Sequence, residues 1–117
     1  MPPPKLRRRT PRAVLVLSAY PGRAAADRAA RRLVKDGVVA CATVVPNGRA
    51  HYRWDGKQRA EPSALLWAKT TAARARAAVR AVRDGHPDEV PEILVLPVSG
   101  GHGPYLAWIA AEVRRGR

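Results

Sequence analysis

One short segment holds the densest group of side chains that could carry chemistry, His86-Pro87-Asp88-Glu89-Val90-Pro91-Glu92. Three of its members are carboxylates, and Asp84 lies just before it, in a chain with only nine acidic residues. Two prolines stiffen the segment, so its side chains lose little entropy on binding. Imidazole nitrogen and carboxylate oxygen are ligands for divalent metals, and the carboxylates could equally accept hydrogen bonds from arginine across a subunit boundary.

The remaining candidates are weaker. Cys41 is the only cysteine, and its thiolate could hold copper, although a lone cysteine in a strand is more often a small buried apolar side chain. The glycine-rich residues 100–103 precede a predicted helix and could receive an anion, but their spacing matches no phosphate-binding loop. His51 and His102 are interpreted as surface histidines. The chain has no nucleophile elbow and no His-Glu-x-x-His zinc motif, so we expect it not to be an enzyme.

The elements that position these residues form two similar halves. An apolar branched run predicts a strand, helical periodicity follows it, and an Asp-Gly pair ends each helix, with glycine suited to the left-handed conformation. The predicted strands cover residues 13–17, 38–46, 64–68 and 93–98, and the helices begin near Arg23, Thr71 and Pro104. This order predicts an α+β, ferredoxin-like βαββαβ fold, in which helices cover one face of a four-stranded antiparallel sheet and an additional helix follows.

The connection between the halves is longer than this fold requires. Residues 47–63 read as an extended hairpin, because Tyr52 and Trp54 lead into Asp55-Gly56, a strong hairpin turn signal. Arms of about six residues would carry such a ribbon roughly 20 Å beyond the sheet. An isolated two-stranded ribbon is marginal in water, so we expect it to dock on another copy of the chain. The alternative is a ribbon that folds back on its own domain.

The length of 117 residues indicates one domain. We assign residues 13–117 to it and interpret residues 1–12 as a disordered basic tail. A single cysteine excludes an intramolecular disulfide and fits a reducing compartment. No apolar run approaches the roughly 20 residues that cross a bilayer. We therefore expect a cytoplasmic protein without membrane partners.

The net charge of +13, from 22 basic and 9 acidic residues, favours a polyanionic partner. A compositional bias toward arginine is the alternative explanation of this charge, because most of the basic residues are arginines and they are scattered over every predicted helix. The RNA-recognition motif shares the βαββαβ order but stacks bases on aromatic residues of its first and third strands. Here only Trp67 is available. Specific nucleic-acid recognition is therefore not expected.

Five sequence segments together resemble the CutA family of divalent-cation tolerance proteins. They are Cys41-Ala42-Thr43-Val44-Val45-Pro46, Tyr52-Arg53-Trp54-Asp55-Gly56-Lys57, Lys69-Thr70, residues 86–92 and Tyr105-Leu106-Ala107-Trp108. The resemblance runs from about Val14 to Val113. The His-Pro-x-x-x-Pro-Glu segment and the Trp-x-Gly hairpin tip are its most specific parts.

The resemblance implies a homotrimer similar to the PII signalling proteins, with ribbons joining sheets between subunits, and a link to copper or other divalent cations. It implies metal ligation by His86 and, more weakly, Cys41, and no required cofactor. The residues expected to shape the inter-subunit clefts are Lys69, Asp88, Glu89 and Glu92, and those expected at the trimer interface are Tyr52, Trp54, Tyr105 and Trp108. The predicted function is that of a non-enzymatic, trimeric metal-response protein; the alternative is a PII-like module that binds a small anion or a partner protein in the same clefts.

Two positions depart from the family pattern. Some members have a cysteine near the end of the first strand that is counted as a metal ligand, and the corresponding residue here is Ser18. The residue after His-Pro is usually aromatic in the family, whereas here it is Asp88. Loss of a thiolate weakens a soft Cu(I) site, while an added carboxylate favours harder or borderline ions.

Overall fold

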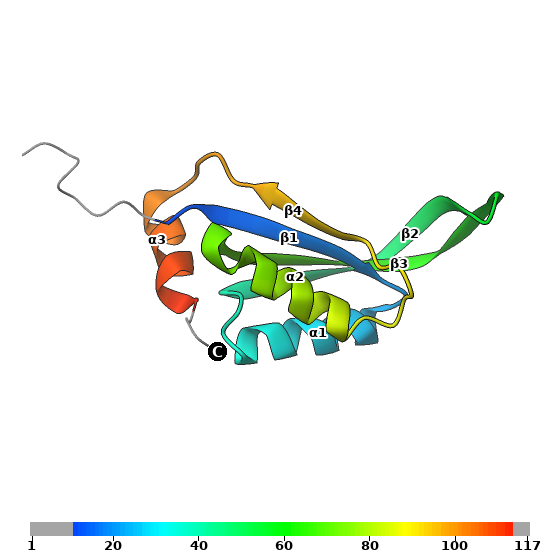
Figure 1. Cartoon of the computed structure of the whole chain (residues 1–117), viewed down its shortest axis with the longest axis horizontal. Coiled ribbons are helices and arrows are strands. Elements are labelled where there is room, and N and C mark those ends of the chain that lie inside the picture. The colour runs from blue at the N-terminus through cyan, green and yellow to red at the C-terminus, as the bar shows by residue number, and fades with distance from the viewer. Residues whose placement is uncertain (1–10, 114–117) are drawn as a thin grey trace, which may run out of the picture.

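The computed structural model describes residues 11–113, so residues 1–10 of the predicted basic tail lie outside the described part. The elements follow one another as two strand–helix–strand halves and a final helix (Figure 1). They are β1 (Ala13–Tyr20), α1 (Arg23–Lys35), β2 (Cys41–Trp54), β3 (Lys57–Thr71), the 3-10 turn η2 (Ala72–Arg74), α2 (Ala75–Asp84), β4 (Ile93–Pro97) and α3 (Gly103–Glu112).

The strands form one antiparallel sheet in the order β2-β3-β1-β4. This confirms the predicted ferredoxin-like arrangement, including the long β2–β3 hairpin and the additional C-terminal helix. Several boundaries differ from the prediction: β1 continues to Tyr20, and β2 begins at Cys41 rather than at Val38. The first turn after Thr71 is a 3-10 turn that the Thr71 side chain does not cap, and α2 begins only at Ala75.

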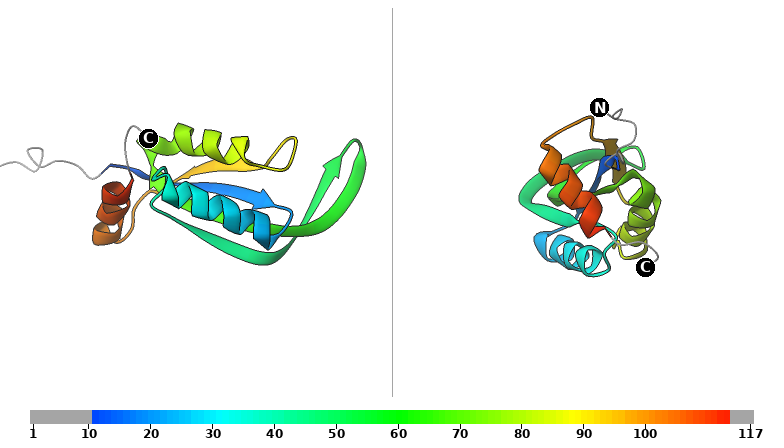
Figure 2. Two further views of the ribbon diagram at one scale, coloured as in Figure 1. Left: turned by 90° about the horizontal axis from the view of Figure 1, so that it is seen from below. Right: turned by 90° about the vertical axis from the view of Figure 1, so that its left-hand side faces the viewer.

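Helices α1 and α2 lie side by side on one face of the sheet (Figure 2). Their buried stripes consist mostly of small side chains, Ala26, Ala29 and Leu33 on α1 and Ala78 and Val82 on α2. Small residues let both helices approach the sheet closely, where alternate residues of β1 and β3, such as Val16 and Leu66, are fully buried. This contact forms the main core of the domain.

Neither α1 nor α2 lies over the opposite face of the sheet, here called the open face (Figures 1 and 2). Within residues 11–113, α3 contacts this face at its Cys41 end, through Tyr105. The strand register places on it the residues that alternate with the core positions: Leu15, Leu17, Cys41, Thr43, Val45, Leu65, Trp67, Lys69, Leu94 and Leu96. Several of these large apolar side chains are strongly exposed, among them Trp67 at 41% and Leu94 at 51%. A contiguous apolar surface of this kind marks an interaction site rather than an ordinary wetted face.

Helix α3 lies at one end of the sheet, where Ile109 packs with Ala13 and Ala40 in a second, smaller apolar cluster. No helix within residues 11–113 is long and apolar enough to cross a membrane.

Candidate functional site

The β2–β3 hairpin leaves the core sheet at a β-bulge between Val45 and Gly48. Asn47 adopts a left-handed conformation there, with φ 67°. Gly48 lies so close to β3 that a Cβ atom at this position would be 2.7 Å from the backbone oxygen of Ser63. Glycine is therefore required at this crossing. Because a bulge bends its strand and increases its twist, the distal part of the hairpin, Gly48–Ser63, projects from the domain as a curved ribbon (Figure 1).

The ribbon turns at Asp55 and Gly56, whose φ angles of 53° and 73° are those of a two-residue type I′ hairpin. The turn pairs Trp54 with Lys57 and sets the register of the whole ribbon. Tyr52 Oη donates a hydrogen bond of 2.9 Å to Glu61 Oε1 across the two strands. This hydrogen bond raises the pKa of Tyr52, because it favours the protonated phenol.

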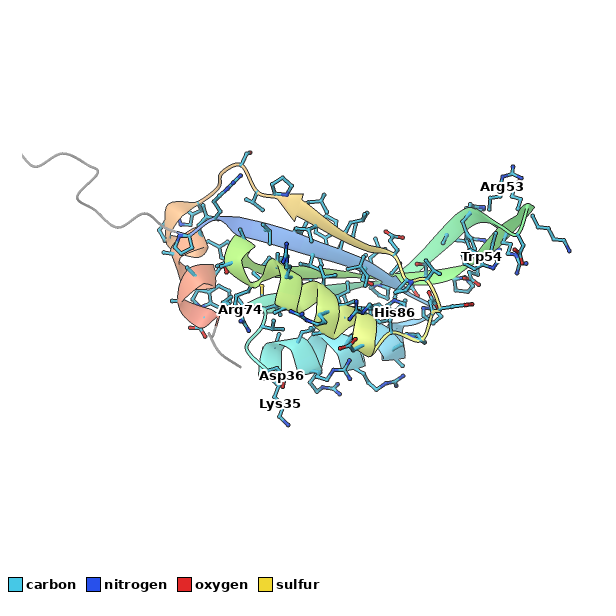
Figure 3. The ribbon with its side chains drawn as sticks, viewed as in Figure 1. Lys35, Asp36, Arg53, Trp54, Arg74 and His86 are labelled. Carbon is cyan, nitrogen blue, oxygen red and sulfur yellow. The ribbon has the colours of Figure 1, made fainter. Side chains whose placement is uncertain are left out.

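His86 holds the start of the acidic segment against the end of β1 (Figure 3). Its side chain is fully buried, and its ring stacks on that of Tyr20 with a centroid distance of 4.3 Å. Nδ1 accepts a hydrogen bond of 3.1 Å from the backbone N–H of Asp88. Nε2 lies 2.7 Å from the backbone oxygen of Ala19 and must donate to it, because a carbonyl oxygen can only accept. This hydrogen-bond pattern fits the tautomer that carries its proton on Nε2.

Ser18 fixes the other end of the same segment. Its hydroxyl group, which is fully buried, donates a hydrogen bond of 2.8 Å to the backbone oxygen of Glu92. Residues 86–92 are thus tied to β1 at both ends, by a ring at one end and a hydroxyl group at the other. The carboxylates of Asp88 and Glu89 remain exposed between these two attachments.

A cleft of about 880 Å³ lies between the ribbon and the acidic segment. Tyr52 and Trp54 contribute aromatic surface to it from the ribbon. Its lining contains four carboxylates, from Glu61, Asp88, Glu89 and Glu92, but only one guanidinium group, from Arg59. In a chain with a net charge of +13, the cleft is therefore a locally acidic region.

The remaining predicted site residues lie at the opposite end of the sheet. Cys41 Sγ is 3.4 Å from Tyr105 Oη, and the Tyr105 ring stacks on Trp108. The hydrogen bond with Cys41 raises the pKa of Tyr105 to about 12. Lys69 Nζ donates to Thr43 Oγ1 at 2.9 Å. Tyr105 and Trp108 are each 42% exposed, so this end also presents aromatic surface to its surroundings.

The strand register separates the two predicted metal ligands. Cys41 pairs with Lys69, which faces Leu15 of β1, whereas His86 contacts Ala19 of the same strand. Four residues of a strand span about 13 Å, so one ion cannot contact both side chains of a single chain. Within residues 11–113 there is also no group of three or more His, Cys, Asp or Glu side chains that could enclose a metal ion.

Two cleft residues, Arg59 and Glu61, were not predicted. Both lie on the strand of the ribbon that follows the turn. The Asp55-Gly56 turn could have predicted their positions, because it sets the register of the two strands. A two-residue turn at these positions places Arg59 opposite Tyr52 and Glu61 opposite Ala50.

Comparison with known proteins gives one consistent result. The family model described as "CutA1 divalent ion tolerance protein" matches residues 14–112. The chain is 36% identical over 102 residues to the divalent-cation tolerance protein CutA of Pectobacterium atrosepticum, which covers 87% of this chain and 93% of the relative. The crystal structure of CutA1 from Oryza sativa superimposes with a TM-score of 0.88 at 30% identity, over 92% of this chain and 98% of that one. The protein from Archaeoglobus fulgidus described as periplasmic divalent cation tolerance protein CutA shares the fold, with a TM-score of 0.84 at 24% identity over 87% of this chain and 99% of that one.

Proposed function

Because the chain belongs to the CutA1 divalent ion tolerance family, we propose that it acts in divalent-cation tolerance as a non-enzymatic homotrimer that binds copper or another divalent cation weakly near the clefts between its subunits. The acidic cleft between the ribbon and residues 86–92 is the observation that carries the cation-binding part of this proposal.

The open face supports assembly. Leu94, Leu96 and Trp67 lie exposed on it, and monomeric proteins rarely leave such a contiguous apolar surface uncovered. The ribbon provides a second argument, because Trp54 at its tip is 42% exposed and a free two-stranded ribbon is marginally stable. Tyr105 and Trp108 at the other end of the sheet offer an aromatic surface on which a neighbouring ribbon would dock. A closed ring of three chains would cover all these surfaces.

The charge of the cleft favours a cation. Glu61, Asp88, Glu89 and Glu92 supply hard oxygen ligands of the kind that divalent ions accept. Because the described residues of one chain contain no preformed group of three metal ligands, the ion would keep part of its water or take ligands from two subunits. Either arrangement is consistent with weak binding.

A metal role for His86 requires a local rearrangement. Both ring nitrogens already have partners, and the ring is buried. Nδ1 lies 3.9 Å from the Asp88 carboxylate, so opening of the 86–88 turn would let these two groups share an ion. A role for Cys41 would require an ion at the Tyr105 end of the sheet. The carboxylates of the cleft need no such opening, and we place the ion there.

The alternative PII-like function, recognition of a small anion in the same cleft, has less support. The cleft of a single chain has four carboxylates and one guanidinium group, so its net negative charge repels anions. Anion binding would therefore depend on basic side chains supplied by a neighbouring subunit.

The test is a calorimetric titration with Cu(II) and Zn(II) of the wild type and of the variant Asp88→Asn/Glu89→Gln/Glu92→Gln. We expect a saturable site with a Kd on the order of 10 to 100 µM in the wild type, and binding at least about tenfold weaker in the variant. The matched control is Asp27→Asn/Asp36→Asn/Asp84→Asn, which removes the same charge from the helices and should bind as the wild type does. Equal losses in both variants would show a net-charge effect and contradict a site in the cleft.

We also propose a cytoplasmic location, which fits the single cysteine of the chain. Cell fractionation tests it, and recovery of the protein in a periplasmic fraction would overturn it.

A further inference from the structure

The outer surface of α1 and α2 collects a large share of the basic side chains. This surface, here called the helix face, comprises Arg23, Arg28, Arg31, Arg32, Lys35, Arg76, Arg80 and Arg83, all exposed. Three acidic residues lie on the same two helices and their ends: Asp27, Asp36 and Asp84. Figure 2 shows both helices in one layer, on the side of the sheet away from the open face. The helix face therefore carries an excess of five positive charges.

The buried stripes of the helices determine which basic residues point outward. On α1, Ala26, Ala29 and Leu33 face the sheet, so the helical period turns Arg28, Arg31 and Lys35 to the opposite side. Figure 3 shows Lys35 projecting away from the sheet. On α2, Ala78 and Val82 are buried, and Arg76 and Arg80 project outward by the same argument.

Most of this charge is not neutralised locally. The ion pairs on these helices are Arg23 with Asp27 and Arg83 with Asp84. Within residues 11–113, Arg28, Arg31, Arg76 and Arg80 have no acidic partner within 4.0 Å. Exposed guanidinium groups without an acidic partner are free to form paired hydrogen bonds with phosphate oxygens.

We propose that the helix face binds the phosphate backbone of double-stranded nucleic acid without reading its sequence. α1 is about 20 Å long, a distance over which duplex DNA carries roughly a dozen phosphate charges. The helices have no aromatic residue, so they lack the stacking surfaces that single-strand binding requires. An anionic membrane fits less well, because an interfacial helix buries its apolar side in lipid and α1 and α2 bury theirs against the sheet.

The test measures binding of a fluorescent DNA duplex of about 24 base pairs by anisotropy, from about 50 to about 200 mM NaCl. The full-length wild type is compared with Arg28→Gln/Arg31→Gln/Arg80→Gln on the helix face. The matched control, Arg49→Gln/Arg53→Gln/Lys57→Gln, removes the same charge from the ribbon. Both variants keep the basic residues near the chain ends, so these contribute equally to binding in all three proteins. Solution mass and circular dichroism are recorded for each protein.

The proposal predicts that the slope of log K against log salt is shallower by about 3 in the helix variant, with affinity at least about tenfold lower at the lowest salt. The ribbon variant should change the slope by less than about 1. Equal losses in both variants would overturn the proposal, because they would show a net-charge effect without a preferred surface. Absence of duplex binding by the wild type would also overturn it, as would binding to phosphatidylglycerol vesicles but not to duplex.

Discussion

The imidazole ring of His86 donates a hydrogen bond to the backbone oxygen of Ala19, 67 positions earlier in the chain, at 2.7 Å. Together with the bond from Ser18 to Glu92 at the far end of the segment, this contact holds the acidic residues against the sheet and beside the ribbon. In a single chain, His86 therefore supports the cleft from within the fold. The exposed carboxylates beside it form the surface of the cleft.

His86→Ala should lower the free energy of unfolding by about 2 to 4 kcal/mol, because it removes a buried ring stacked on Tyr20 and leaves the Ala19 carbonyl without its donor. Chemical denaturation at matched protein concentration measures the change. His102→Ala is the control, because His102 is exposed and its side chain does not cap α3; it should change stability by less than about 0.5 kcal/mol. Similar stability of His86→Ala and the wild type would contradict the supporting role of His86.

Gly48→Ala should destabilise the base of the ribbon by about 1 to 3 kcal/mol, because the new Cβ atom would lie 2.7 Å from the Ser63 backbone oxygen. The strands must then move apart at the bulge. Gly100→Ala introduces the same methyl group where no atom lies within 4 Å, and it should be nearly neutral. Thermal unfolding compares the two variants, and equal melting temperatures would show that the crossing at Gly48 is not tight.

Because of the contact between Cys41 and Tyr105, the free energy of unfolding should depend on pH in the alkaline range. The pKa of Tyr105 is raised from 10.0 to about 12, chiefly by this hydrogen bond. A raised pKa in the folded state means that the stabilisation is complete below about pH 10 and is lost as the pH rises toward about 12. Ultraviolet titration of the phenol groups checks this. Cys41→Ala should lower the pKa of one tyrosine, whereas Cys41→Ser retains a hydrogen-bonding partner and should shift it less. Identical curves for wild type and Cys41→Ala would refute the contact.

Most of the fold could be predicted from local patterns. Apolar runs, helical periodicity and paired Asp-Gly ends gave the element order, and Asp55-Gly56 gave the hairpin turn and its register. The start of α2 was misplaced, because Thr71 favours a helix start but the next three residues form a 3-10 turn. The residue types at Asn47 and Gly48 did not predict the β-bulge, because the position of the bulge depends on how closely β2 and β3 approach each other.

The arrangement of the site was less predictable. The sequence singled out His86 and Cys41 as side chains capable of holding metal, but their partners, Ala19 and Tyr105, are 67 and 64 positions away in the chain. Only tertiary structure shows that both nitrogens of His86 are engaged and that Cys41 lies at the other end of the sheet. Whether either residue binds metal remains a prediction, and the same Cu(II) and Zn(II) titration of His86→Ala and Cys41→Ala would test it.

Assembly through the open face is the claim on which the inter-subunit cleft depends, and the mass of Trp67→Asp in solution tests it most directly. Trp67 lies at the centre of that face, paired with Leu17 and Thr43, so a charge there should not be tolerated in an interface. We predict a mass near three times 12.7 kDa for the wild type and near 12.7 kDa for Trp67→Asp. Val34→Asp, which places the same charge on an exposed position of α1, should assemble as the wild type does. A wild-type monomer, or an intact trimer of Trp67→Asp, would contradict the account.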